Sequence, residues 1–191
     1  MNTRSLQENE IKDLYDLYIK HDFPINELRP LREILRLVKT DLYICYGYFE
    51  NSSLLAYACL ARATDSSYAL LDYLAVIPEQ RQSGIGGRFL QELKQSLPYK
   101  GLFIEAETPT KTNNIEEQII RQRRIDFYEK NDAELTNISG PLFGTFFSIM
   151  YLPIQSKQPI AEQSLQAIKD IYREITPLLL FKLFVHYKIR N

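Results

Sequence analysis

The sequence predicts a mixed α+β fold with a mostly antiparallel central sheet. Three strand-like runs rich in aromatic and aliphatic residues follow one another at Leu42 to Glu50, Leu54 to Ala63 and Tyr68 to Val76. Only short polar turns separate them, which is typical of an antiparallel meander. A helical segment that begins at a glycine and a further strand come next. This order indicates a βαβ crossover.

Before the meander, the chain is expected to form one short strand and two helices. The strand is expected at Asn2 to Leu6. Apolar residues then recur at helical spacing from about Glu8 to His21, and Phe23-Pro24 ends that helix. A second amphipathic helix is expected from about Leu28 to Lys39, with Asn26 as its N-cap.

After the meander, helices and strands alternate up to the C-terminal tail. The expected elements are a helix at Gly86 to Ser96, a strand at Leu102 to Glu107, a helix at Ile115 to Asn131, strands at Glu134 to Ile138 and Phe143 to Leu152, and a helix at Ile160 to Ile175. The last segment, Leu178 to Ile189, is ambiguous. Its alternating apolar residues favour a strand, whereas its overall apolar character favours a docked helix.

Length and composition exclude several classes of protein. A chain of 191 residues with 45% hydrophobic residues fits one domain with a sizeable core. The 23 basic and 24 acidic residues give a net charge of −1, so no overall field attracts nucleic acid or an anionic membrane. The polar residues Met1 to Glu10 do not resemble a signal peptide, and the apolar run Leu178 to Val185 is too short to span a bilayer.

The cysteines and histidines do not indicate a disulfide framework or a metal site. Cys45 and Cys59 lie in apolar segments, which favours reduced, buried thiols in a cytoplasmic protein. His21 and His186 are isolated from other ligand-type residues at metal-binding spacing. We therefore expect no metal.

The strongest functional pattern is the loop from Val76 to Gly87, which connects a strand to a helix. At such a helix start, several backbone N–H groups lack partners and the helix dipole adds positive potential, so a diphosphate is well accommodated. Glycines allow the phosphates to approach the backbone. The loop lacks the third glycine of a dinucleotide-binding fingerprint and the lysine of a Walker loop.

Two motifs resemble those of the GNAT superfamily of N-acetyltransferases. Arg81, Gly84 and Gly86 have the spacing of the acyl-CoA-binding motif in that family. The segment Arg121 to Asn131, with its Phe127-Tyr128-Glu129-Lys130 run, is similar to the helix of the family that ends in Tyr-Glu-Lys. Both motifs lie where the family has them in its order of strands and helices.

The order of predicted elements from Thr3 to Leu152 also resembles that family. The resemblance implies a GNAT-like sheet with helices on both faces. It further implies a GNAT domain over residues 1–153 and a C-terminal extension, residues 154–191, packed on the same domain.

If the resemblance holds, acetyl-CoA is the cosubstrate and the protein is an acyltransferase. The backbone around Leu74 and Val76 is then expected to pair with the pantetheine arm where the fourth and fifth strands separate. The loop amides are expected to hold the pyrophosphate. The cofactor-binding residues implied in this way are Leu74, Ala75, Val76, Arg81, Gln82, Ser83, Gly84, Ile85, Gly86 and Gly87.

The second motif departs from the family in two places. Arg121 stands where many members have Asn, which puts a usual cofactor contact in doubt. Asp132 replaces the usual Gly after the helix, although Asp tolerates a left-handed C-cap better than most residues. Arg121, Arg123 and Arg124 either contact CoA phosphates or an acidic substrate group, or form one solvated helix face.

The position of Tyr128 in the motif implies a role as general acid to the CoA thiolate. The amine must also lose a proton before it attacks, since an alkylamine has a pKa near about 10. Three strand carboxylates are candidates for this task. Asp72 has the same facing parity as Leu74 and Val76, and Glu105 and Glu107 share a face of the next strand. Solvated charges at the strand ends are the alternative.

Several alternatives stay open. Within the same fold, the alternatives are a GNAT domain that uses a different acyl-CoA and an acyl-CoA-binding sensor. A nucleotide-binding interaction protein is the alternative from another class. The acceptor is expected to be a small-molecule or peptide amine, and the protein a monomer or homodimer. Aromatic residues either line its pocket or pack in the core: Phe23, Tyr73, Phe143 and Phe146.

Overall fold

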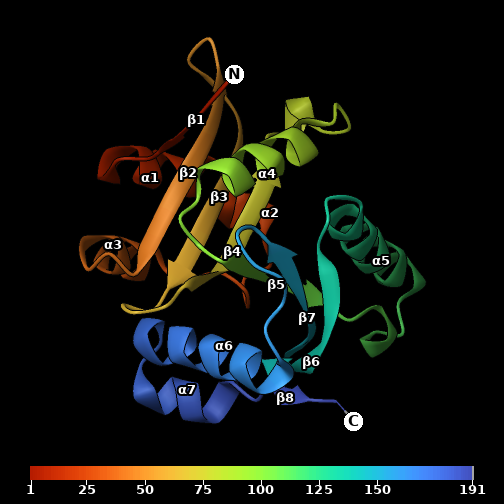
Figure 1. Ribbon diagram of the computed structural model, residues 1–191. Coiled ribbons are helices and arrows are strands. Elements are labelled where there is room, and N and C mark those ends of the chain that lie inside the picture. Colours follow the sequence, from red (N-terminus) through yellow and green to blue (C-terminus); the bar gives the residue numbers. More distant parts are fainter. Residues whose placement is uncertain (191) are drawn as a thin grey trace.

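A computed structural model describes residues 1–190, which form one eight-stranded sheet with helices on both faces (Figure 1). The strand order is β1-β2-β3-β4-β5-β7-β6-β8, and only β4 and β5 pair in parallel. The strands are β1 (Asn2–Ser5), β2 (Tyr43–Glu50), β3 (Ser53–Arg62), β4 (Tyr68–Val76), β5 (Gly101–Glu107), β6 (Glu134–Leu142), β7 (Thr145–Pro153) and β8 (Lys188–Ile189). The predicted mixed, mostly antiparallel fold is confirmed.

The sheet separates the core into two layers, and helices cover each of them. One apolar cluster joins the sheet to α1, α3 and α6, and the other joins its opposite face to α4 and α5. The helices are α1 (Glu8–Leu14), the π-helical turn η1 (Tyr15–Ile19), α2 (Lys20–Asp22), α3 (Leu31–Lys39), α4 (Ile85–Ser96), α5 (Ile115–Lys130), α6 (Ala161–Ile175) and α7 (Leu178–Phe184), with short 3-10 turns η2 (Pro78–Gln80) and η3 (Pro109–Lys111). None of them has the length and apolar character needed to cross a membrane, as far as residues 1–190 are concerned.

The second N-terminal helix begins later than the sequence predicts, and Asn26 does not cap it. The helix starts after Pro30. Proline disfavours the helical conformation in the residue before it, here Arg29, so the helix cannot extend further upstream. Asn26 instead donates a hydrogen bond from Nδ2 to Thr145 Oγ1 at 3.1 Å. The loop before α3 is therefore irregular and lies next to the start of β7.

The ambiguous C-terminal segment forms both kinds of structure. Its first part is the helix α7, which lies beside α6, and its last part is the short strand β8 paired with β6 (Figure 1). Phe143 was expected to begin a strand but lies in the turn between β6 and β7, with φ of 45°. The neighbouring Gly144 has φ of 90°, so this turn needs left-handed backbone that a strand cannot provide.

The sheet opens between β4 and β5. Their parallel pairing covers only Tyr68–Leu71 against Gly101–Ile104. Within residues 1–190, the rest of β4 has no partner strand on that side. A register shift opposite β3, where Cys59 pairs with Tyr73 and Leu60 with Leu71, leaves Asp72 as an extra, bulged residue. A bulge bends a strand and interrupts its alternation of faces.

The two cysteines are buried, as predicted. Cys45 and Cys59 are free thiols and register partners on β2 and β3, with their Sγ atoms 2.7 Å apart. They belong to the same core cluster as α1 and α3.

Candidate active site

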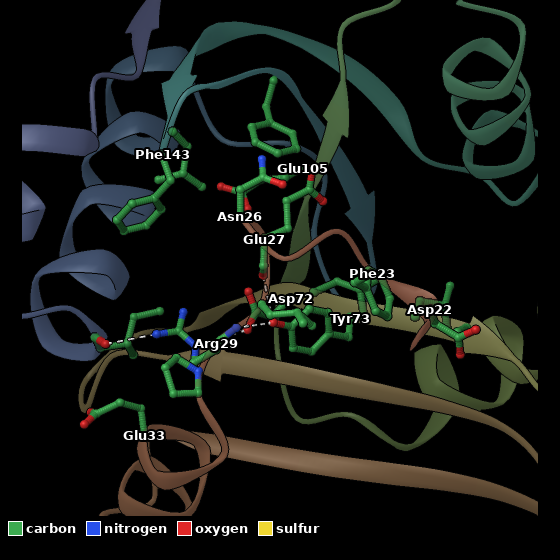
Figure 2. Close-up of a pocket in the computed structure, with 18 of the residues that line it drawn as sticks. Asp22, Phe23, Asn26, Glu27, Arg29, Glu33, Asp72, Tyr73, Glu105 and Phe143 are labelled. Atoms are coloured by element: carbon green, nitrogen blue, oxygen red, sulfur yellow. Dashed lines mark hydrogen bonds and ion pairs between the residues drawn. The ribbon is translucent and has the colours of Figure 1, made fainter. Parts of the chain in front are cut away.

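A cavity of about 620 Å³ lies where β4 and β5 separate (Figure 2). Its walls come from segments far apart in the chain: the loop between α2 and α3, β4, β5, α5, the β6–β7 turn and the C-terminal tail. The cavity thus combines the N-terminal region, the gap in the sheet, the β6–β7 region and the tail.

At one end of the cavity, the loop before α4 presents backbone N–H groups without protein acceptors. From Gln82 to Gly87, no backbone N–H donates to an acceptor within residues 1–190. Gln82 and Gly84 have φ of 65° and 76°. Left-handed residues in a turn direct neighbouring N–H groups toward a shared concavity, and the start of α4 adds positive potential. This loop therefore fits a diphosphate.

Two side-chain contacts fix that loop against its surroundings. The Arg81 guanidinium pairs with Asp22 Oδ1 at 2.7 Å through Nη2, and its Nε donates to the Val76 carbonyl at 3.2 Å. A Cβ on Gly86 would lie 3.3 Å from the side chains of Phe127 and Val76. Arg81 thus holds the loop to the end of α2, and the backbone N–H groups are left to bind an anion.

Tyr128 reaches the cavity from α5. Its side chain is only 7% exposed, it lines the cavity, and its hydroxyl makes no hydrogen bond within residues 1–190. Burial raises the pKa of Tyr128 to about 12, against a lowering effect of Arg124. The phenol is therefore neutral at physiological pH and free to donate a hydrogen bond. Asp132, after the same helix, has the left-handed φ of 71° that its place in the motif implied.

Asp72 lies at the cavity, but its predicted orientation is wrong. As the bulged residue of β4, it turns to the α6 side of the sheet and accepts a hydrogen bond from Tyr43 at 2.5 Å. Leu74 and Val76 pack on the opposite side, against the α4 layer. Asp72 also pairs with Arg29 at 3.4 Å (Figure 2). A bulge is not visible in the alternation of side chains, so simple parity put Asp72 on the wrong face.

Glu107, unlike Glu105 on the same strand β5, is held in ion pairs. Arg121 and Arg124 of α5 pair with Glu107 at 3.0 Å and 2.7 Å. Glu107 is not part of the cavity wall. These contacts also account for two of the three clustered arginines, which are held by a carboxylate and do not simply form a solvated face.

Glu105 is held by two phenols of the C-terminal tail. Tyr172 and Tyr187 both donate to its Oε1, at 2.6 Å and 2.5 Å. Burial raises the pKa of Glu105 to about 7, while the two tyrosine hydrogen bonds act in the opposite direction. Of the three predicted carboxylates, Glu105 alone lines the cavity without an ion pair within residues 1–190.

A fourth carboxylate, Glu27, was missed. It lies in the irregular loop before α3, lines the cavity and is partly buried. Burial and then the charge of Glu107 raise its pKa to about 7, against the effects of Arg124 and Arg121. Tyr172, Tyr187 and Arg29 were also missed. No sequence signal identifies them, because their positions depend on how the loop and the tail pack on the sheet.

A model of the acetyltransferase (GNAT) family matches residues 9–131. No curated protein sequence matches the chain. Among solved structures, a protein from Bacteroides thetaiotaomicron that is assigned to the GNAT family has a TM-score of 0.70 at 18% identity, over 92% of this chain and 97% of that chain. Its similarity extends well beyond the segment that the family model matches.

Two enzymes with named acceptors are also similar in fold. The aminoglycoside 6'-N-acetyltransferase from Enterococcus faecium has a TM-score of 0.58 at 14% identity, over 83% of this chain and 100% of that chain. The spermidine N-acetyltransferase from Vibrio cholerae, solved with CoA and spermine, has a TM-score of 0.56 at 11% identity, over 81% of this chain and 96% of that chain. At these identities the likeness concerns the fold.

Proposed function

The chain belongs to the acetyltransferase (GNAT) family, whose acyl donor is acetyl-CoA, and we propose that it transfers the acetyl group directly to the amine of an acceptor. The observation that carries this proposal is the row of N–H groups from Gln82 to Gly87 at the mouth of the gap between β4 and β5. A diphosphate at the start of a helix satisfies such groups. The gap between β4 and β5, beside this loop, is open for the rest of the acetyl-CoA molecule.

The residues that would hold acetyl-CoA follow from this arrangement. The amides of Gln82–Gly87 would bind the pyrophosphate, whereas the Arg81 N–H donates to the Pro78 carbonyl at 3.3 Å. The backbone of Leu74, Ala75 and Val76, beyond the last residue paired with β5, is available to the amides of the pantetheine arm. When bound, acetyl-CoA supplies an acetyl thioester. The chain's own residues must then orient the acceptor and manage its proton.

Tyr128 is proposed to stabilise the departing thiolate. A phenol with a pKa of about 12 is protonated at neutral pH. Full transfer of its proton to a thiolate with a pKa near about 8.5 is unfavourable, because the two pKa values differ by roughly 3 to 4 units. Hydrogen-bond donation to the sulfur is therefore the better-supported role. In the balanced reaction, a C–N bond forms, the C–S bond breaks, and the proton lost by the amine offsets the proton gained by the thiolate.

Glu105 is the best-supported acceptor of the amine proton. Arg29 neutralises Asp72, and Arg121 and Arg124 neutralise Glu107, whereas Glu105 has only neutral hydrogen-bond donors. A carboxylate with a pKa of about 7 is a suitable general base near neutral pH. Its Oε2 accepts no hydrogen bond within residues 1–190.

Calorimetry with four ligands tests the cosubstrate. We expect acetyl-CoA to bind, and acetyl-pantetheine, which lacks the diphosphate, to bind at least about tenfold more weakly because the loop amides stay unused. ATP and NAD should bind more weakly than acetyl-CoA, because the gap between β4 and β5 suits a pantetheine arm. Equal affinity for acetyl-CoA and acetyl-pantetheine would contradict the diphosphate site, and a preference for ATP or NAD would favour the nucleotide-binding alternative.

A further inference from the structure

The cavity contains two carboxylates that make no ion pair within residues 1–190. Each of its four arginines has an acidic partner within residues 1–190. The pairs are Arg29 with Asp72, Arg32 with Glu33, Arg81 with Asp22, and Arg124 with Glu107. Glu27 and Glu105 line the same cavity and make no ion pair in that part of the chain. A buried carboxylate without a counter-ion is costly, and a bound cation would remove that cost.

Glu27 and Glu105 act on the same part of the cavity. Glu105 accepts a hydrogen bond from Tyr187, and the charge of Glu27 contributes to the raised pKa of that same tyrosine. Figure 2 shows both carboxylates on the side of the cavity formed by the loop before α3 and by β5. Both carboxylates therefore act on Tyr187.

An exposed apolar rim borders the cavity on the side of the tail. We define this apolar rim as Phe143, Leu180 and Phe184. Phe143 and Leu180 line the cavity and are each 38% exposed. The rings of Phe143 and Phe184 pack with their centroids 5.2 Å apart, and Figure 2 shows Phe143 beside the C-terminal helices. Such a contiguous apolar surface next to a pocket is typical of a binding site.

The C-terminal tail positions Glu105 and supplies part of the apolar rim. Tyr172 and Tyr187 orient Glu105, and the carbonyl of Ile175 accepts a hydrogen bond from Arg29 at 3.2 Å. Leu180 and Phe184 belong to α7. Residues beyond the matched family segment therefore supply much of this end of the cavity.

We propose that the acceptor is a primary amine on an apolar body, with its ammonium group at Glu27 and Glu105 and its body against the apolar rim. This inference rests on the proposed function. Polycationic acceptors fit less well, because the acidic side chains Asp22, Glu33 and Asp72 already pair with arginines.

Two bisubstrate analogues test the apolar body. In each, the CoA sulfur is joined through an acetyl linker to an amine, either nonylamine or spermidine, which have similar chain lengths. We expect the nonylamine analogue to bind at least about tenfold more tightly by calorimetry, since small differences in apolar burial in a pocket already produce such ratios. Leu180→Asn should reduce this preference roughly fivefold. Leu179→Asn, on the same helix but 69% exposed and outside the cavity, should leave it unchanged.

The ammonium site is tested separately, because an analogue in amide form carries no charge at that nitrogen. Glu27→Gln should raise the KM for free nonylamine about tenfold and leave the affinity for the nonylamine analogue unchanged. An unchanged KM would refute the ammonium site. Equal or tighter binding of the spermidine analogue would refute the acceptor class and leave the proposed function intact. If neither analogue nor CoA binds, the proposed function itself is refuted, and the acceptor class with it.

Discussion

Tyr128 and Glu105 line the same cavity, but they differ in whether their polar atoms have hydrogen-bond partners. The Tyr128 hydroxyl has no hydrogen-bond partner within residues 1–190, so its removal leaves no buried group unsatisfied. Glu105 accepts from two buried tyrosines, so its removal would leave two phenols without partners. Phenylalanine is therefore a clean test at Tyr128, and glutamine, which retains an acceptor oxygen, is the suitable replacement at Glu105.

Tyr128→Phe should lower kcat by about 100-fold, because the departing sulfur loses its hydrogen-bond donor. The affinity for acetyl-CoA should change little. Thiol release measures the first quantity and calorimetry the second. Tyr46→Phe is the matched control, since burial also raises the pKa of Tyr46 to about 12 but Tyr46 lies outside the cavity. Unchanged turnover of Tyr128→Phe would remove the proposed role.

The pH dependence of kcat/KM should report Glu105 and Glu27. Burial raises the pKa of each to about 7, and a carboxylate accepts a proton only when it is ionised. The rate should therefore fall as the pH decreases below about 7, and not only near the ordinary value of 4.5. Glu105→Gln should lower the rate and give this acidic limb a smaller slope. A profile that is flat between pH 5 and 8 in the wild type would exclude both groups.

At the scale of elements, the loop before α4 depends on one glycine. Gly84 has φ of 76°, and a Cβ at this position would meet no atom within 4 Å. Gly84→Ala should thus cost about 1 kcal/mol of folding stability through backbone strain alone. Because that strain favours a different loop conformation, the Kd for acetyl-CoA should rise several-fold.

Gly144→Ala is the matched control for this prediction. Gly144 also has positive φ, at 90°, and equally open surroundings, but it lies in the β6–β7 turn. It should lower stability by a similar amount and leave acetyl-CoA affinity unchanged. Chemical denaturation and calorimetry of the two variants supply the comparison. Equal effects on affinity would mean that the loop has no special role.

The elements that could be predicted from the sequence are those with strong local signals. The alternating runs between polar turns correctly gave β2, β3 and β4, and the glycine start correctly indicated α4. The start of α3 was wrong because the proline effect on Arg29 was overlooked. The face of Asp72 was wrong because the bulge comes from pairing with β3, which local alternation does not contain.

The candidate site could be predicted only where a motif defines it. The loop amides and Tyr128 lie in motifs, and Arg81, at the start of that loop, lines the same cavity as Tyr128. Glu27, Tyr172 and Tyr187 lie in a loop and a tail without motifs. They reach the cavity through tertiary packing, so no local pattern in the sequence identifies them.

At the scale of the whole molecule, the burial of Glu105 should make stability depend on pH. The pKa of Glu105 is about 7 in the folded protein and 4.5 ordinarily. Between these values the native state keeps a proton that the unfolded chain has lost. Stability from this group is therefore complete below pH 4.5 and is lost as the pH rises toward 7, by at most about 3 kcal/mol.

Glu105→Gln isolates that contribution, because glutamine does not titrate. The free energy of unfolding of the variant relative to the wild type should shift in favour of the variant as the pH rises through this window. Urea denaturation at pH 4.5 and at pH 7.5 gives the two differences that are compared. A difference that does not change with pH would show that burial does not raise the proton affinity of Glu105.

The most direct test of direct acetyl transfer is thiol release from acetyl-CoA in the presence of single amines, followed by mass spectrometry of enzyme and acceptor. We predict one thiol released for each amide formed, nonylamine as a better acceptor than spermidine, and no acetyl group left on the enzyme. Tight binding of acetyl-CoA without amine-dependent thiol release would contradict the account and indicate a sensor.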